Sequence, residues 1–393
     1  MHCASGEQTL EESLRQFWTI EDFPSAAASP RPEDEACEAL FRDTHIRDSN
    51  GWFVVRLPVK GVLPAVGLET RRMAMGSLAC MHRRFVRDPK LAQAYREFMS
   101  VYESLGHMEQ VPTSEIDDPR AWYLPHHAVV QSTLSTWKIR VVFDASRRTC
   151  DRQCLNDFLM AGPALQRDLS LILLNWRRYR YVFTADIVKM FRQVNVFPRD
   201  RDLQRIVWAP NSSDPPREDR LTTVTYGTAC APYFAIRTLL QLAEDERSRF
   251  PLGAQCLASN TYVDDTFAGA NGLLDARRIR QELVDLLHSA GVELDKWSAN
   301  HPDLLPPNAP RAVEEESRSI GTDESVKTLG IFWSPHQDDF RFTTSGFHDG
   351  SGVLTKRVIL SNIARLFDPL GWLAPITVTT KILMQDLWIL KCE

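Results

Sequence analysis

The sequence predicts an α+β fold in which an antiparallel sheet packs against helices. Segments typical of strands and helices follow one another between residues 181 and 343 in the order strand, helix, hairpin, helix, strand. The helices are too few for a doubly wound sheet, in which parallel strands need crossover helices. No repeat at a fixed period is visible. We therefore expect one antiparallel sheet with helices on one face.

The composition is that of a globular chain with room for two or three subdomains. It has 393 residues, 44% hydrophobic and 25% charged, with a net charge of −5. Its 8 cysteines are scattered, which argues against a disulfide scaffold, and Cys150 and Cys154 lack a second pair at zinc spacing. Neither a signal-peptide pattern nor an apolar run of about 18 residues occurs. These features predict a reducing, cytoplasmic setting.

Charge is distributed unevenly along the chain. Residues 1–50 carry 4 Lys/Arg against 11 Asp/Glu, a net of −7, whereas residues 138–205 carry 14 Lys/Arg against 7 Asp/Glu, a net of +7. A basic region inside an acidic chain fits a channel for a polyanion, and it equally fits a solvated charged face. Charge alone does not decide between these interpretations.

The first 180 residues are expected to begin with an acidic linker and to continue with short strands and helices. Ser25–Glu38 is rich in Ala, Pro and Glu, which is typical of a linker. Asp88 and Pro89 begin a helix with one apolar face, and Gly106 ends it. Further helices are expected at Leu10–Ile20 and Leu169–Tyr179, and strands at Trp52–Leu57, Ala128–Val130 and Ile139–Phe143.

The second half contains the elements of the predicted sheet. Tyr181–Ala185 is a short apolar strand that leads into Asp186. Helices are expected at Ala231–Arg247 and at Asp275–Ala290, the second of which is ended by Gly291. Residues 300–325 are expected to form a loop. A second hairpin is expected from Leu329–Trp333 and Phe340–Thr343, followed by helices at Leu354–Phe367 and Pro375–Leu390.

The chain is organised around Tyr262-Val263-Asp264-Asp265. Two short strands are expected to meet here at a tight turn, with two adjacent carboxylates exposed at the tip. Adjacent carboxylates repel each other and resist burial, and a divalent cation removes both penalties. Asp-Asp also occurs at residues 117–118 and 338–339, so the pair by itself is a weak signal.

Asp186 supplies a third carboxylate at the end of a predicted strand. A strand end beside a hairpin tip brings three acids around one pair of metal ions, with the main-chain carbonyl of Ile187 as a further ligand. Two-metal sites of this kind stabilise the attacking and leaving oxygens of phosphoryl transfer. The alternative for Asp186 is an ordinary solvated strand end.

In chain order, the motifs resemble those of the reverse transcriptases of long-terminal-repeat retrotransposons, specifically the BEL/Pao group. The resemblance covers roughly residues 45–390. It is carried by Arg140-Val141-Val142-Phe143-Asp144, by Asp186 through Phe191, by Gly227 and Pro232, by Tyr262–Asp265, by Lys296 within Glu293–Trp297, and by Leu329-Gly330-Ile331-Phe332-Trp333. The run from Thr355-Lys356-Arg357 through Asp368–Gly371 to Leu387-Trp388 resembles the segment catalogued as a Pao retrotransposon peptidase family.

The resemblance implies a right-hand polymerase fold in a fragment of a longer Pol polyprotein. Residues 1–48 would form the acidic linker, 49–180 the fingers with an N-terminal extension, and 181–345 a palm with catalytic and primer-grip hairpins. Residues 346–393 would form a helical partial thumb or connection. In the intact element, RNase H and integrase would be partners, and the setting would be a cytoplasmic retrotransposon particle.

The implied activity is an RNA-directed DNA polymerase that adds dNTPs to a primer 3′-hydroxyl on an RNA or DNA template. By resemblance, Asp186, Asp264 and Asp265 are catalytic and bind two Mg²⁺ or Mn²⁺ ions together with Ile187. Lys296 would donate a proton to the leaving pyrophosphate. The alternative for Lys296 is an ordinary exposed lysine.

The resemblance implies a nucleotide site formed by residues of both the fingers and the palm. Arg140 would grip the triphosphate, unless it pairs with Asp144 instead. Phe191 would exclude a ribose 2′-hydroxyl, or would simply belong to the core. Gly227 permits close backbone approach to the incoming base, and Tyr226 stands where most retroviral enzymes have Gln. Lys138 is a candidate for a second triphosphate cation.

Three other functions compete with a DNA polymerase. An aspartic peptidase needs Asp-Thr-Gly or Asp-Ser-Gly, and neither tripeptide occurs. An RNA polymerase of the same architecture must admit the 2′-hydroxyl, which Phe191 argues against. A catalytically weak or inactive remnant that only binds nucleic acid stays open, although all three acids are present.

Overall fold

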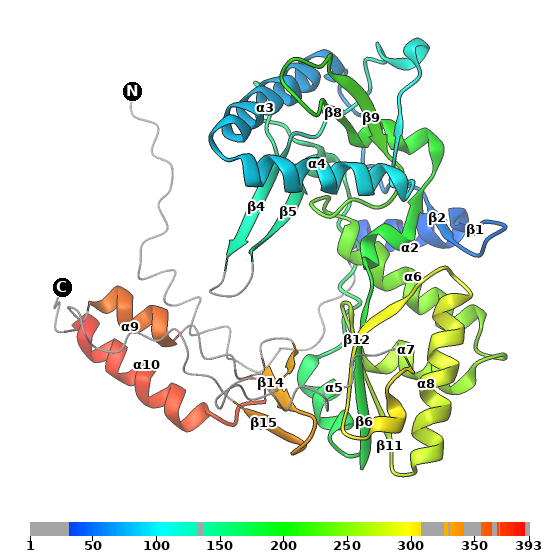
Figure 1. Ribbon diagram of the computed structural model, residues 1–393, viewed down its shortest axis with the longest axis vertical. Coiled ribbons are helices and arrows are strands. Elements are labelled where there is room, and N and C mark those ends of the chain that lie inside the picture. Colours follow the sequence, from blue (N-terminus) through cyan, green and yellow to red (C-terminus); the bar gives the residue numbers. More distant parts are fainter. Residues whose placement is uncertain are drawn as a thin grey trace.

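The computed structural model describes residues 31–132, 137–307, 326–328, 331–341, 355–363, 368 and 370–389. The expected helix at Leu10–Ile20 and most of the expected loop at 300–325 lie outside these residues, as do Leu329, Gly330 and the end of the strand expected at Phe340–Thr343. Figure 1 shows an upper part around α3, α4, β8 and β9 and a lower part around β6, β11 and β12, with α2 and α6 between them. The fold is α+β, as predicted, with several small sheets and helices.

A four-stranded antiparallel sheet forms the lower part. Its order is β10 (Thr261–Tyr262), β11 (Asp265–Ala270), β6 (Tyr181–Ile187) and β12 (Leu294–Ala299). The apolar run of β6 explains its central place, because four of its seven residues are consecutive buried positions. The strand that completes the sheet is β12. No strand was expected at these residues, and the described part of the hairpin expected at Leu329–Trp333 and Phe340–Thr343 lies in a separate sheet.

Both faces of this sheet are covered, which corrects the expectation of helices on one face only. Alternate residues of a strand face opposite sides. On one face, Phe183 and Ala268 belong to the main core. This core also contains Leu283 of α8 (Leu273–His288) and residues of α7 (Pro251–Asn260). Val182 and Phe267 instead pack with Trp176 of α5 (Leu169–Trp176). Trp333 joins them from the sheet formed by β13 (Val326–Thr328), β14 (Ile331–Ser334) and β15 (Asp339–Arg341).

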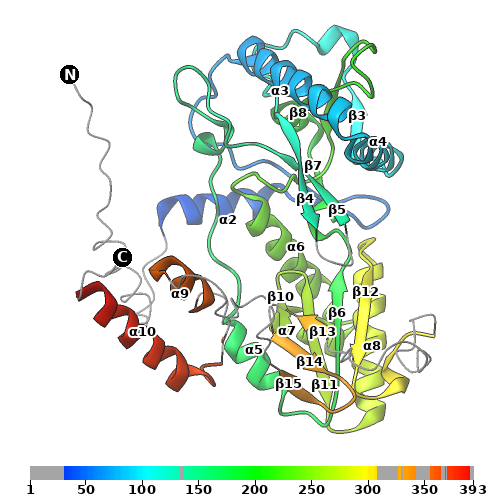
Figure 2. The same cartoon turned by 60° about the vertical axis from the view of Figure 1, so that its left-hand side comes forward.

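The upper part is built from helices, a three-stranded sheet and a β-ribbon. α4 (Pro89–Ser104) begins at Asp88, whose side chain accepts from the Leu91 N–H, as the cap signal predicted. α3 (Gly67–Arg87) was not anticipated, because Thr70 and Ala74 stand at inward positions where larger apolar residues would reveal the period. β3 (Met108–Gln110), β9 (Arg217–Leu221) and β8 (Arg205–Trp208) form the sheet. β4 (His126–Ser132) pairs with β5 (Trp137–Phe143) as a ribbon that points toward the lower part in Figures 1 and 2.

Helix α2 (Pro32–Thr44) begins within the stretch expected to be a linker. Its Pro and acidic residues stand in the first helical turn, where both are favourable, so a composition typical of linkers here marks a helix start. Cys37 and Phe41 are buried, and the Phe41 ring lies 6.3 Å from those of Tyr233 and Phe234 on α6 (Ala231–Asp245). Residues 32–44 are therefore part of the fold.

The remaining elements connect the two parts or follow them. β1 (Ile46–Arg47), β2 (Phe53–Val55) and β7 (Val194–Val196) form a small sheet in which β2 and β7 are parallel. Helices α9 (Lys356–Ile363) and α10 (Ala374–Ile389) follow at the C-terminal side, near the positions expected for them. Short 3-10 helices occur at Thr113–Glu115, Leu155–Phe158, Met190–Gln193, Pro198–Gln204 and Pro302–Leu304. No helix in the described ranges meets the length and apolarity that a membrane crossing requires.

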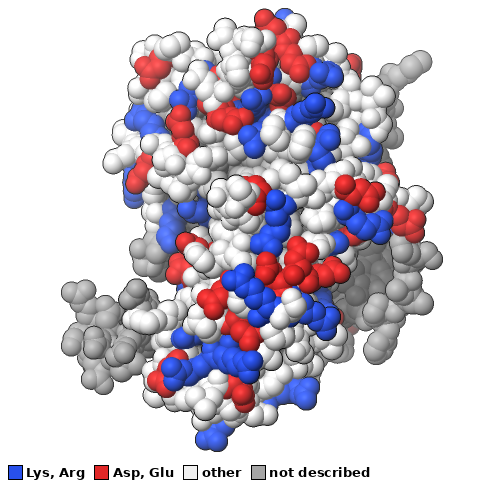
Figure 3. Space-filling model, turned by 90° about the vertical axis from the view of Figure 1, so that its right-hand side faces the viewer, with Lys and Arg blue, Asp and Glu red and all other residues white. Residues whose placement is uncertain are grey.

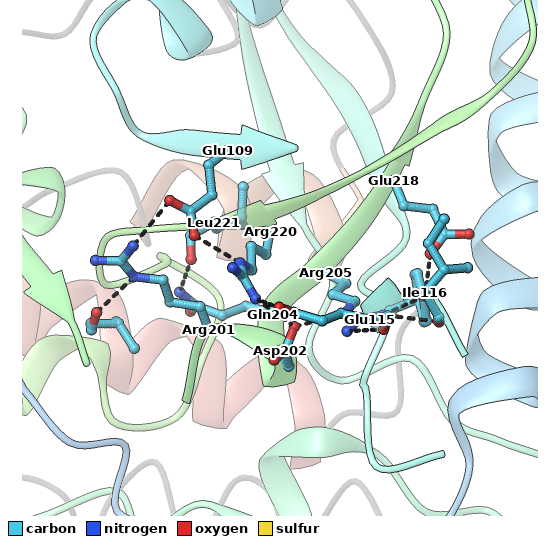
Figure 4. Close-up of polar contacts among 12 residues, drawn as sticks. Glu109, Glu115, Ile116, Arg201, Asp202, Gln204, Arg205, Glu218, Arg220 and Leu221 are labelled. Atoms are coloured by element: carbon cyan, nitrogen blue, oxygen red, sulfur yellow. Dashed lines mark hydrogen bonds and ion pairs between the residues drawn. The ribbon is translucent and has the colours of Figure 1, made fainter. Parts of the chain in front are cut away.

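A polar network holds the upper sheet to the segments beside it (Figure 4). Arg205 is fully buried; its guanidinium pairs with Asp202 at 2.8 Å and donates to the carbonyls of Glu115 and Ile116. Arg220 pairs with Glu109, Glu115 and Asp202, and Glu109 also pairs with Arg201. These arginines are satisfied within the fold and are not available to a ligand.

The network bears on the basic region expected at residues 138–205. Within that region Arg148, Arg177, Arg201 and Arg205 form ion pairs with Asp157, Asp338, Glu109 and Asp202. The face in Figure 3 carries basic and acidic side chains interspersed, without a surface of one sign. Two of these partners, Asp338 and Glu109, lie outside the region, so residues distant in the sequence compensate part of its excess positive charge.

Candidate active site

The β10–β11 hairpin and the end of β6 bring the three predicted carboxylates to one end of the sheet. Asp265 stands opposite Asp186 in the antiparallel register, and Tyr262 stands opposite Asp265 across the hairpin. Asp264 lies in the two-residue turn, where its carbonyl accepts from the Ile187 N–H at 2.7 Å. The structure thus brings Asp186, Asp264 and Asp265 together, and it ties the Ile187 backbone directly to the turn.

Strand β12 adds Lys296 to this group through a bulge. Asp295 stands opposite Asp186 and Ser298 opposite Thr184, so β12 has one extra residue at this point. Lys296 is in the left-handed region with φ 51°, and bulges of this kind re-aim a side chain. Its ammonium group lies 3.0 Å from Asp186 Oδ2, and this contact raises the pKa of Lys296.

The two hairpin carboxylates are in an unfavourable electrostatic environment. Burial, reinforced by repulsion from Asp264 and Asp186, raises the pKa of Asp265 to about 7. Burial and the charge of Asp186 also raise the pKa of Asp264. Negative charge is therefore concentrated at this end of the sheet beyond what Lys296 compensates, which is the environment that a cation stabilises.

The donor set suits a hard divalent cation, because carboxylate and carbonyl oxygens are the ligands of Mg²⁺ and Mn²⁺. The side chains are nevertheless not gathered into a ready-made site. Within the described ranges, no group of three or more His, Cys, Asp or Glu side chains is arranged to hold a metal ion. Asp264 and Asp265 are half-buried, not exposed at the tip as expected, and Asp186 is bound to Lys296. The chemistry of these residues fits a divalent cation.

The residues expected to bind the nucleotide include Arg140 and Lys138 on β5 and Tyr226 and Gly227 in the loop before α6. Arg140 is exposed on β5. Burial raises the pKa values of Asp264 and Tyr226, and the positive charge of Arg140 partly opposes this rise. Asp144 accepts from the Ser146 N–H, and the described residues contain no ion pair between Arg140 and Asp144. Lys138 is exposed on the same strand.

Tyr226 and Gly227 join that loop to β5. The Tyr226 hydroxyl donates to the Val141 carbonyl, and its ring lies 5.9 Å from that of Phe143. Gly227 has φ 107°, and a Cβ there would lie 2.4 Å from the Phe143 carbonyl oxygen. The close approach for which Gly227 is needed is therefore to β5 in this structure. Approach to an incoming base stays a prediction.

Phe191 and Arg192 lie in the 3-10 helix Met190–Gln193 that follows β6. Phe191 is half-buried against the main core, which leaves both of its expected roles open. Arg192 was missed by sequence analysis. Its guanidinium lies 5.3 Å from the centre of the Tyr102 ring. Burial raises the pKa of Tyr226, and the charges of Arg192 and Arg140 oppose that rise. The sequence signal that could have identified Arg192 was its position directly after Phe191, the last residue of the motif that begins at Asp186.

Residues 355–393 match the family described as the Pao retrotransposon-like RNaseH-like domain. This agrees with the resemblance of Thr355–Trp388 to a Pao retrotransposon segment. The description names neither a peptidase nor a thumb, so both of those interpretations stay predictions.

Comparisons with other proteins add little to this match. No curated protein matches the chain. A foamy viral protease-reverse transcriptase solved in complex with double-stranded DNA is similar with 15% identity and a TM-score of 0.49, over 77% of this chain and 44% of that one. A prototype foamy virus protease-reverse transcriptase mutant gives 15% and 0.40, over 53% and 24%. The chain thus spans less than half of either structure, and these low values establish neither a shared fold nor a shared activity.

Proposed function

We propose that this chain is the polymerase part of a retroelement Pol protein and acts as an RNA-directed DNA polymerase. The observation that carries the proposal is the register of the hairpin, which sets Asp265 opposite Asp186 with Asp264 in the adjoining turn. Three mutually repelling carboxylates at a sheet end have no evident structural benefit, whereas phosphoryl transfer uses such a set. The Pao retrotransposon match at residues 355–393 supports a retroelement origin.

In the proposed mechanism, Asp186, Asp264, Asp265 and the Ile187 carbonyl would hold two Mg²⁺ or Mn²⁺ ions. Such ions, when bound, activate the attacking hydroxyl and neutralise charge on the transferred phosphate. Lys296 contacts only Oδ2 of Asp186, so both oxygens of this carboxylate become available only when it separates from Lys296. The released ammonium group is then free to donate a proton to the pyrophosphate as it leaves.

The nucleotide would bind between the sheet end and the β4–β5 ribbon. Arg140 has no carboxylate partner among the described residues, so its guanidinium is free to bind triphosphate oxygens. Arg192 supplies a second positive charge beside Tyr226. Phe191 would lie against the sugar and exclude a 2′-hydroxyl. The fingers, palm and thumb layout and the template–primer partner belong to this same proposal.

Primer extension tests the proposal. The purified chain should extend a DNA primer on poly(rA) with Mg²⁺ or Mn²⁺, and Asp264→Asn combined with Asp265→Asn should lower the rate by about 100-fold or more. The matched control is Asp117→Asn combined with Asp118→Asn, an acidic pair in a loop of the upper part that should leave the rate unchanged. Equal extension by the hairpin variant and the wild type would refute the site.

Two further measurements separate the alternatives. Phe191→Ala should raise ribonucleotide relative to deoxyribonucleotide incorporation, and an unchanged ratio would remove the gate role. An inactive remnant would bind template–primer without extending it. Binding of either kind should weaken steeply with salt, because phosphate contacts release counterions.

A further inference from the structure

The turn of the β10–β11 hairpin is strained and has little support from its own strands. β10 contains only Thr261 and Tyr262, so few ladder hydrogen bonds fix it. Val263 begins the turn with φ 54°, in the left-handed region that β-branched residues rarely adopt. A conformation of this kind persists only when surrounding residues hold it in place.

Gln166 binds this turn through both ends of its side-chain amide. Its Oε1 accepts from the Val263 N–H at 2.9 Å, and its Nε2 donates to the Thr261 carbonyl at 3.3 Å. Nε2 also lies 3.4 Å from the Arg167 carbonyl. An amide combines a donor and an acceptor in one rigid plane, so a single side chain spans the strained residue and the strand before it.

The segment that carries Gln166 is itself anchored to the sheet. Asp168, two residues later, caps α5 by accepting from the Ser170 and Leu171 N–H groups. At the other end of α5, the buried Trp176 donates from Nε1 to the Ala268 carbonyl at 3.2 Å. Asn175 donates to Asn260 at 3.3 Å, just before β10 begins. The position of Gln166 is therefore set relative to both strands of the hairpin.

The opposite side of the turn is held by β6, where the Ile187 N–H donates to the Asp264 carbonyl. The turn is thus bound from two sides, by Ile187 on the strand that carries Asp186 and by Gln166 on the segment before α5. We propose that Gln166 is a positioning residue that fixes the Val263–Asp264 turn and thereby places Asp264 and Asp265 relative to Asp186. Only the catalytic consequence of this placement rests on the proposed polymerase function.

Hydrogen exchange of the full chain tests the placement independently of any activity. In Gln166→Ala, the Val263 amide loses its acceptor, and its exchange in a peptide covering residues 261–266 should accelerate about tenfold, as expected for one hydrogen bond. Gln166→Glu keeps the acceptor and should retain most of the protection. The control is Gln281→Ala, an exposed glutamine on α8 that should change nothing in this peptide. Unchanged exchange in Gln166→Ala, with wild-type melting behaviour, would overturn the proposal.

Steady-state primer extension tests the catalytic consequence. Gln166→Ala should lower kcat by about tenfold or more with KM for dNTP nearly unchanged, because misplaced carboxylates impair the chemical step while the nucleotide contacts remain. Gln166→Glu should restore part of kcat. A raised KM with unchanged kcat would refute a positioning role. If the wild type does not extend primers, the polymerase proposal fails, and the exchange measurement alone decides whether Gln166 holds the turn.

Discussion

Replacing Asp265 by Asn should make the protein more stable at alkaline pH, even though the same change should abolish primer extension. Asp265 is half-buried at the hairpin and is repelled by Asp264 and Asp186, which together with burial raises its pKa to about 7. The ionised form is therefore disfavoured in the folded state. Asparagine has nearly the same shape and no charge, so it removes the repulsion without leaving a cavity.

The magnitude follows from the difference between the folded and unfolded pKa values. The change from 3.8 to about 7 corresponds to roughly 4 kcal/mol for a fully buried group. Solvent reaches part of this carboxyl and screens it, so we reduce the expectation to about 2 kcal/mol. For an acid with a raised pKa, the folded state is penalised only when the group is ionised. The penalty is thus complete at pH 8, declines as pH falls through about 7, and is absent below about pH 4.

Urea unfolding in a chelator measures this difference without a bound cation. Asp265→Asn should raise the free energy of unfolding at pH 8, and most of the gain should disappear at pH 4.5. The matched control is Asp295→Asn, which also stands opposite Asp186 in the sheet but is exposed and should give no gain. A gain of equal size at both pH values, or no gain at pH 8, would refute the electrostatic reasoning.

Three other outcomes follow from the structure. His126 is buried and neutral, donating from Nε2 to the Val207 carbonyl and accepting at Nδ1 from Tyr95, and burial lowers its pKa to about 4. Between pH 7 and pH 5 the wild type should therefore lose about 2 kcal/mol more than His126→Gln in urea unfolding, because only the wild type must keep this buried imidazole neutral. Gly227→Ala should cost about 2 kcal/mol or more, because its Cβ would lie 2.4 Å from the Phe143 carbonyl oxygen at φ 107°; wild-type stability would contradict this. Arg205→Ala should cost about 3 kcal/mol or more, because it removes a buried guanidinium that pairs with Asp202 and donates to the carbonyls of Glu115 and Ile116, whereas the exposed Arg199→Ala should cost almost nothing in the same titration.

Sequence patterns located the elements with strong local signals. The capped helix α4, the strand β6 before Asp186 and the hairpin at Tyr262–Asp265 were predicted close to their observed bounds. Each carries a cap, an apolar run or a turn flanked by strand-forming residues, and such signals act within a few residues of one another. Helix α3 was missed because Thr70 and Ala74 stand at two of its inward positions, and strand β12 because a bulge interrupts its alternation. Their place in the fold depends on partners elsewhere in the chain.

The sequence by itself determined the order of the candidate site residues and the local elements that carry them, a strand end for Asp186 and a turn for Asp264 and Asp265, because each element is specified by neighbouring residues. Tertiary structure alone decided what surrounds them. The contact of Lys296 with Asp186 depends on a bulge in β12, and the support that Gln166 gives Val263 joins residues 97 apart in the chain. Such contacts are set by strand register and helix docking. These depend on the packing of the whole core, and no local pattern encodes them.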